Sequence, residues 1–184
     1  DFNPHFFKLP PLLSYLLFFL YGIYFVVGYI FGFFSSLSDF EQLFFSDPSS
    51  FYFLGRIIFG ALFGTATVFL VYHFALKCWQ HQGIALLSAL FLSFSFLHVE
   101  HSHYVYHDIP MTFFGLLSVF FVYDIYRGKK MRNYVYAALC AGIATGFKYN
   151  AALFSLPIFI AHVFREEKPA LRNIFLDKKI YVAA

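Results

Sequence analysis

Charged side chains are scarce in this 184-residue chain, at 12% of its residues, whereas ordinary soluble domains carry roughly 25%. Cysteine is also scarce: Cys78 and Cys140 lie far apart and no CxxC motif occurs. A disulfide framework or a cysteine-based zinc site is therefore not expected. The net charge is only +3, and no basic patch alternates with solvent-facing polar residues, so the sequence gives no sign of a nucleic-acid partner.

Apolar and aromatic residues are correspondingly abundant. Hydrophobic residues make up 60% of the chain, a figure that includes the aromatic residues, which are 24% of the chain. Phenylalanine alone occurs thirty times. A soluble domain of this length could not bury so much apolar side chain, so the composition predicts an all-α, polytopic membrane bundle. Several apolar stretches are shorter than the roughly 20 residues that cross a bilayer. The stretches are 11–34, 54–76, 83–97, 109–126, 134–147 and 149–164.

The placement of lysine and arginine predicts an orientation. If 54–76 runs inward, ten of the thirteen basic residues lie on the inner side, as the positive-inside rule expects. The other three, Lys8, Arg56 and Lys148, then lie near the outer face. Each could simply extend its charge to the interface. Stretch 11–34 is ambiguous, because a span there would move Lys8 to the inner side, whereas an interfacial helix would not.

The segment from His98 to Pro110 is the most polar part between two apolar stretches. Ionisable groups near membrane depth are costly and by default mark a site. One hypothesis is a metal site in a transporter or an intramembrane metalloenzyme, although no HExxH motif occurs. The other is a polar lining that binds a substrate, and a channel or scaffold without chemistry is a third class. The candidate metal ligands are His101, His103 and His107; the candidate lining residues are Glu100, His103, His107 and Tyr149.

Four motifs occur in order along the chain: a Pro-Pro-Leu segment in 3–16, an arginine-led helix in 55–65, the loop 98–111, and a Gly-rich turn ending in Lys-Tyr in 141–149. Together they resemble the GT-C fold glycosyltransferases of the dolichyl-phosphate-mannose protein mannosyltransferase family (glycosyltransferase family 39 type). The resemblance covers nearly the whole chain.

The resemblance implies three regions. Residues 1–53 would be an outer juxtamembrane segment with interfacial helices, 54–164 a bundle of about five transmembrane helices, and 165–184 an inner loop leading to a further span. It also implies that the chain is the amino-terminal part of a longer protein. The principal catalytic acid of the family would then precede Asp1, and this part alone would be inactive.

The implied activity is transfer of a sugar, with inversion, from a polyprenyl-phosphate donor to an acceptor hydroxyl. The implied roles are phosphate binding by Arg56 and Lys148, with Lys8 as a third candidate, and a catalytic role for Asp108, on the acceptor side or in positioning the base. The donor lipid is needed but no cofactor, and a divalent metal is a secondary option. Partners would be membrane lipid, the donor, a protein or glycolipid acceptor, and the remainder of the chain. The plasma (inner) membrane with a periplasmic active face is expected, and the endoplasmic reticulum is the alternative.

Overall fold

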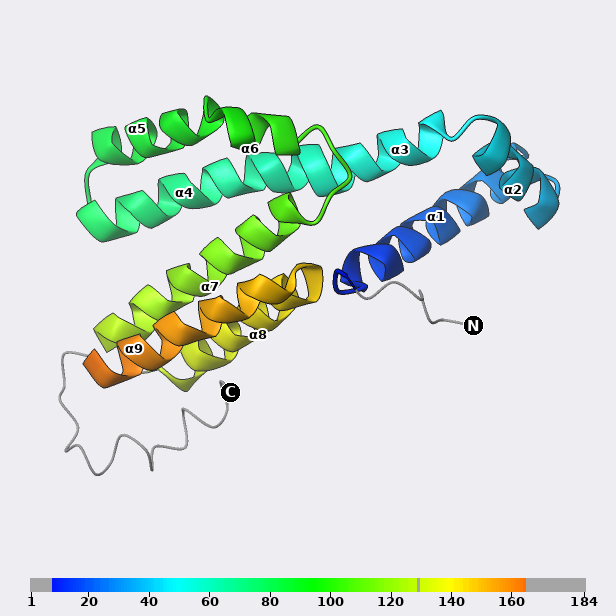
Figure 1. The fold of residues 1–184 in the computed structure, drawn as a ribbon. Helices are drawn as coiled ribbons and strands as arrows, with labels where there is room; N and C mark the ends of the chain where they lie inside the picture. Colours follow the sequence, from blue (N-terminus) through cyan, green and yellow to red (C-terminus); the bar gives the residue numbers. More distant parts are fainter. Residues whose placement is uncertain (1–7, 129, 165–184) are drawn as a thin grey trace.

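The computed structural model describes residues 8–128 and 130–164, and these form helices with no strand (Figure 1). The all-α prediction is confirmed. The predicted inner loop 165–184 lies outside the described residues. The elements are α1 (Leu12–Ile30), α2 (Leu37–Ser46), α3 (Ser49–Gly55), the π-helix η1 (Arg56–Leu62), α4 (Phe63–Trp79), α5 (Gln82–Ser93), α6 (Phe96–His101), α7 (Asp108–Gly128), α8 (Met131–Phe147), the 3₁₀-helix η2 (Tyr149–Ser155) and α9 (Leu156–Phe164).

Elements α3, η1 and α4 form one continuous helix, Ser49–Trp79, of 31 residues. At 1.5 Å per residue it is about 46 Å long, more than the roughly 30 Å of bilayer hydrocarbon. It begins after Pro48, which is tolerated at a helix start, and ends at Trp79, because the next residue, Gln80, has a left-handed φ of 53°. The helix is longer than the predicted stretch 54–76 mainly at its first turns, so Arg56 lies well inside it.

The bundle is built from two antiparallel helix pairs, α4 with α5 and α7 with α8, and α9 packs on α7. Alanines at 137, 141 and 144 are buried on α8 and allow α7 to approach closely. In the described part, three helices are long and apolar enough to cross a membrane: Leu12–Ile30, Ser49–Trp79 and Asp108–Gly128. The five predicted spans of 54–164 correspond to α3–α4, α5–α6, α7, α8 and η2–α9, of which α3–α4 and α7 reach that length alone.

Helix α1 begins beside the end of α8 and extends beyond the α7–α9 bundle (Figure 1). A side chain at Gly146 would contact Leu12. Beyond the bundle, aromatic rings join α1, α2 and α3, with Phe51 at the centre of their edge-to-face contacts. Its partners are Tyr21, Tyr24, Phe40 and Phe44. By length and composition α1 could span a membrane, so the interfacial position of 1–53 stays a prediction.

At the end of the bundle near the α4–α5 turn, Lys77 links two helices. Its ammonium lies 2.7 Å from an Asp124 carboxylate oxygen and 3.6 Å from the centre of the Phe120 ring. This pair joins the last turn of α4 to α7. The two ends of the bundle therefore carry different ionic contacts, and the sites predicted from sequence lie at the other end.

Candidate functional site

The antiparallel packing of α7 and α8 brings Asp108 next to Lys148. Asp108 is the first residue of α7, and Lys148 directly follows α8 with an extended backbone. The Lys148 ammonium donates a 2.6 Å hydrogen bond to Asp108 Oδ1. The two side chains are 31% and 20% exposed, so the pair is only partly screened by solvent. Both residues were predicted from sequence as site residues, and the fold makes them one group.

The second carboxylate oxygen of Asp108 contacts His101. The distance from His101 Nδ1 to Asp108 Oδ2 is 3.5 Å, and the contact becomes an ion pair when the imidazole is protonated. His101 is the last residue of α6. The Asp108 carboxylate therefore lies between the His101 imidazole at the end of α6 and the Lys148 ammonium at the end of α8. From sequence, His101 was predicted only as a metal ligand, and no local pattern indicated this contact.

His107 lies just before α7 and is partly buried. Its ring Nδ1 is buried and has no hydrogen-bond partner among the described residues. Burial lowers the pKa of His107 from its ordinary value; the Asp108 carboxylate opposes this, and the Lys148 ammonium adds to it. A lowered pKa means that the imidazole is neutral at neutral pH.

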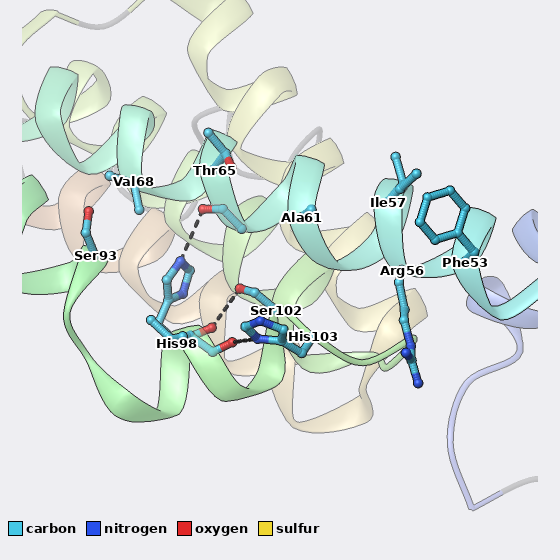
Figure 2. A pocket seen from close by; sticks show the side chains of 12 residues that line it. Phe53, Arg56, Ile57, Ala61, Thr65, Val68, Ser93, His98, Ser102 and His103 are labelled. Atoms are coloured by element: carbon cyan, nitrogen blue, oxygen red, sulfur yellow. Dashed lines mark hydrogen bonds between the residues drawn. The ribbon is translucent and has the colours of Figure 1, made fainter.

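Arg56, the first residue of η1, is exposed and lies between two hollows. The first hollow has a volume of about 590 Å³ and is lined by His98 and Ser102 among others. Figure 2 shows that the Arg56 side chain extends away from these two residues. The second has a volume of about 330 Å³ and is lined by Tyr52, Arg56, His101, Tyr104, Val105 and Tyr106. Because His101 also contacts Asp108, the second hollow adjoins the Asp108–Lys148 pair.

The loop segment after α6 is held against glycines of the long helix. The Ser102 carbonyl occupies the place of a side chain at Gly60, and the Ser102 hydroxyl lies against Gly64. The ring Nε2–H of His98 donates a 3.1 Å hydrogen bond to the Gly64 carbonyl (Figure 2). The Gly60-x-x-x-Gly64 spacing therefore serves the approach of α6 and its loop to the long helix, which fixes His101 near Arg56.

The other predicted site residues make fewer contacts with the rest of the described chain. Glu100 and Tyr149 are exposed, and His103 donates a 2.7 Å hydrogen bond from Nδ1 to the Val99 carbonyl. Lys8 is exposed, and in the described part of the chain no hydrogen bond or ion pair holds it. Arg56 likewise has no direct ion pair with Asp108 there. It lines the same hollow as His101, which contacts Asp108. The structure thus brings Asp108 and Lys148 into contact and places Arg56 in the adjoining hollow.

The histidine-based metal hypothesis requires a cluster of ligands. Among residues 8–128 and 130–164, no group of three or more histidine, cysteine, aspartate or glutamate side chains could hold a metal ion. His101, His103 and His107 do not converge: His101 contacts Asp108, and His103 bonds to its own helix. Within the described residues, these three histidines therefore do not form a shared set of metal ligands.

The family model described as dolichyl-phosphate-mannose-protein mannosyltransferase matches residues 8–180. The chain belongs to this family. The resemblance based on the four motifs is confirmed. A curated relative from Aquifex aeolicus, named only as an uncharacterized protein, is 33% identical over 122 residues, which cover 65% of this chain and 24% of the relative. The chain thus matches about a quarter of that relative's length. No solved structure matches the chain.

Proposed function

We propose that the full-length protein is a membrane glycosyltransferase that moves a sugar, with inversion, from a polyprenyl-phosphate donor to a hydroxyl of a protein or glycolipid acceptor. Family membership supports a membrane glycosyltransferase in general. The observation that supports the finer proposal is the Lys148–Asp108–His101 group beside the hollow that contains Arg56. Two permanent cations, Lys148 in this group and Arg56 in the hollow, therefore lie near the same end of an apolar bundle, where we expect a lipid-borne phosphate to bind.

The chemistry assigns a role to each cation. The acceptor oxygen attacks the anomeric carbon from the face opposite the phosphate, and the bond from that carbon to the phosphate oxygen breaks. Negative charge then grows on the departing lipid phosphate. Arg56 can bind two phosphate oxygens through its planar guanidinium, and Lys148 acts as a point charge. Preorganised positive charge stabilises this leaving group in the transition state.

Asp108 fits a role in positioning Lys148. Both of its carboxylate oxygens already have nitrogen partners, so accepting the acceptor's proton would require one of those contacts to open. The family resemblance assigns the proton-accepting carboxylate to a first outer loop before Asp1. Asp108 would then fix the Lys148 ammonium and help to orient that base. Lys8 precedes α1, and α1 begins beside the end of α8 (Figure 1). We therefore retain Lys8 as a third, weaker phosphate ligand.

We place this end of the bundle at the outer face of a plasma membrane, with the endoplasmic reticulum as the alternative. The described cations Lys77, Arg127, Lys130 and Arg132 lie at the opposite end, near the α4–α5 and α7–α8 turns (Figure 1). The positive-inside rule puts that end in the cytoplasm. The Arg56 end then faces the compartment where lipid-linked sugars are consumed.

Transfer by the full-length protein in vesicles that contain polyprenyl-phosphate mannose tests the proposal. Arg56→Ala should lower turnover by about 100-fold or more, the usual loss when one preorganised electrostatic group is removed. Asp108→Asn should lower it strongly as well, because Lys148 loses its anchor. Arg127→Ala, an exposed arginine at the opposite end, is the matched control and should keep wild-type turnover. Wild-type turnover in both Arg56→Ala and Asp108→Asn would refute the proposed roles.

A further inference from the structure

Three tyrosines line the smaller hollow beside Arg56. Tyr52 comes from α3, whereas Tyr104 and Tyr106 come from the loop between α6 and α7. Their side chains are 54%, 53% and 42% exposed, so the rings are open to a ligand. Arg56 and His101 supply cationic and hydrogen-bonding groups to the same hollow.

Exposed tyrosines near a membrane surface commonly form an interfacial belt in which each ring lies separately among lipid headgroups. These three instead share a hollow of about 330 Å³, within the size range of small-ligand sites. A pyranose ring presents C–H faces, which pack on aromatic rings, and hydroxyl groups, which bond to phenol, imidazole and guanidinium groups. The combination of rings and polar groups in this hollow matches a sugar better than it matches a lipid tail.

The larger hollow on the other side of Arg56 has a different lining. Its exposed surface is mostly apolar, with Ile57, Ala61 and Val68 on the long helix, and it contains no tyrosine. Polar side chains also line it, namely Thr65, Ser93, His98, Ser102 and His103. Arg56 lines both hollows. A molecule with an apolar tail, a phosphate and a sugar in that order fits the larger hollow, the Arg56 guanidinium and the tyrosine-lined hollow in the same order.

We propose that the smaller hollow binds the pyranose ring of the lipid-linked donor, with Tyr52, Tyr104 and Tyr106 as its sugar-binding residues. This rests on the proposed function, since the donor's phosphate is placed at Arg56. Because His101 lines this hollow and contacts Asp108, a bound sugar lies next to the Asp108–Lys148 pair. The tyrosines thus act on recognition of the sugar, while the cations act on the phosphate.

Comparing the binding of a bare lipid phosphate with that of a sugar-bearing lipid phosphate separates recognition of the sugar from recognition of the phosphate. The full-length protein in lipid nanodiscs is titrated with polyprenyl phosphate alone and with polyprenyl phosphate bearing mannose, glucose or galactose. The wild type should bind at least one sugar-bearing lipid more tightly than the bare phosphate. Tyr104→Ala and Tyr106→Ala should each lose about 2- to 10-fold of that preference and leave binding of polyprenyl phosphate unchanged. Tyr104→Phe keeps the ring and should retain most of the preference.

Two variants serve as controls. Arg56→Ala should weaken binding of the bare and the sugar-bearing lipids alike, because both carry the phosphate. Tyr136→Ala, on α8 and 46% exposed, removes a ring of similar exposure outside the hollow and should change neither. If the tyrosine variants weaken both kinds of lipid equally, or change neither, the sugar site is refuted while the proposed function stands. If the wild type binds no polyprenyl phosphate at all, the proposed function itself fails.

Discussion

Lys148 and Asp108 are 40 residues apart in sequence, yet their ammonium and carboxylate groups are 2.6 Å apart in the fold. The pair joins the end of α8 to the start of α7. Asp108 also contacts His101, the last residue of α6. Three chain segments thus meet at one carboxylate. The ammonium of Lys148 is held by Asp108. Such preorganised charge is what the proposed reaction needs to stabilise its leaving phosphate.

Asp108→Asn and Lys148→Met should be strongly non-additive. If Asp108 acts through Lys148, the double variant should transfer sugar about as slowly as the slower single variant, with a coupling of about 1–3 kcal/mol in the transition-state free energy. Turnover of the full-length protein and its three variants measures this.

The Lys77–Asp124 pair is the matched control, because it is also short but lies at the other end of the bundle. Lys77→Met with Asp124→Asn should couple in unfolding free energy and leave transfer per folded molecule unchanged. Additive effects of Asp108→Asn and Lys148→Met on turnover would show that the two residues act independently.

Gly60 should not tolerate a side chain. A Cβ there would overlap the Ser102 backbone carbonyl, and backbone cannot move aside as a flexible side chain can. We expect Gly60→Ala to destabilise the full-length protein by about 1–3 kcal/mol, as overpacking does, and to displace the loop that carries His101. Unfolding in mixed detergent measures the loss.

Gly142→Ala is the control for this glycine. Gly142 also lies within a helix, but no neighbouring atom lies within 4 Å of the position that a Cβ would take there, so alanine should be neutral or stabilising by about 0.5–1 kcal/mol. If Gly60→Ala and Gly142→Ala were equally stable, the close seating of Ser102 on the helix would be wrong.

Composition and periodicity were sufficient to predict the helical class and most helix positions. Stretches 109–126 and 134–147 each match one helix within a few residues, α7 and α8, because long apolar runs bounded by charge or glycine leave few alternatives. Stretch 83–97 is instead divided between α5 and α6. The break follows Ser93, and no proline or glycine marks it in the sequence.

For the candidate site, the sequence allowed a list of residues to be proposed but not their geometry. Charges that are rare in an apolar chain stand out, so Asp108, Arg56 and Lys148 were identified from sequence. Which of them touch depends on the angle between helices and on where α6 ends. The contact of His101 with Asp108 and the π-helical turn that begins at Arg56 arise from tertiary packing, and residue spacing carries no signal for either. The three tyrosines of the smaller hollow could not be singled out from sequence, because fourteen tyrosines occur in the chain and only the fold shows which of them share a hollow.

His107 should make the protein less stable in mild acid. Its pKa in the fold is lowered by burial, so the unfolded chain takes up a proton at a higher pH than the folded one. Stability is then highest above the ordinary value of 6.5 and falls as the pH drops through that value toward the lowered one. The melting temperature of the full-length protein should therefore fall between about pH 7.5 and about pH 5, the range in which histidine titrates.

His107→Gln should flatten that decline, since glutamine has no proton to gain. His103→Gln is the matched control: His103 is exposed and bonded to its own helix, and its loss should leave the pH dependence of the melting temperature unchanged. An equally steep decline in wild type and His107→Gln would contradict the link between this buried ring and acid sensitivity.

Lys8 should lie on the same side of the membrane as the Asp108–Lys148 pair. Helix α1 is apolar enough to span, and a span would carry Lys8 to the other side. However, Leu12 lies against Gly146, close to Lys148 at the end of α8. This contact keeps the start of α1 at the outer end of α8. In the full-length protein without Cys78 and Cys140, a membrane-impermeant maleimide should label Lys8→Cys and Glu100→Cys in intact cells. Lys130→Cys, at the opposite end, should be labelled only after permeabilisation. Labelling of Lys8→Cys with the pattern of Lys130→Cys would show that α1 crosses the bilayer and would remove Lys8 from the phosphate site.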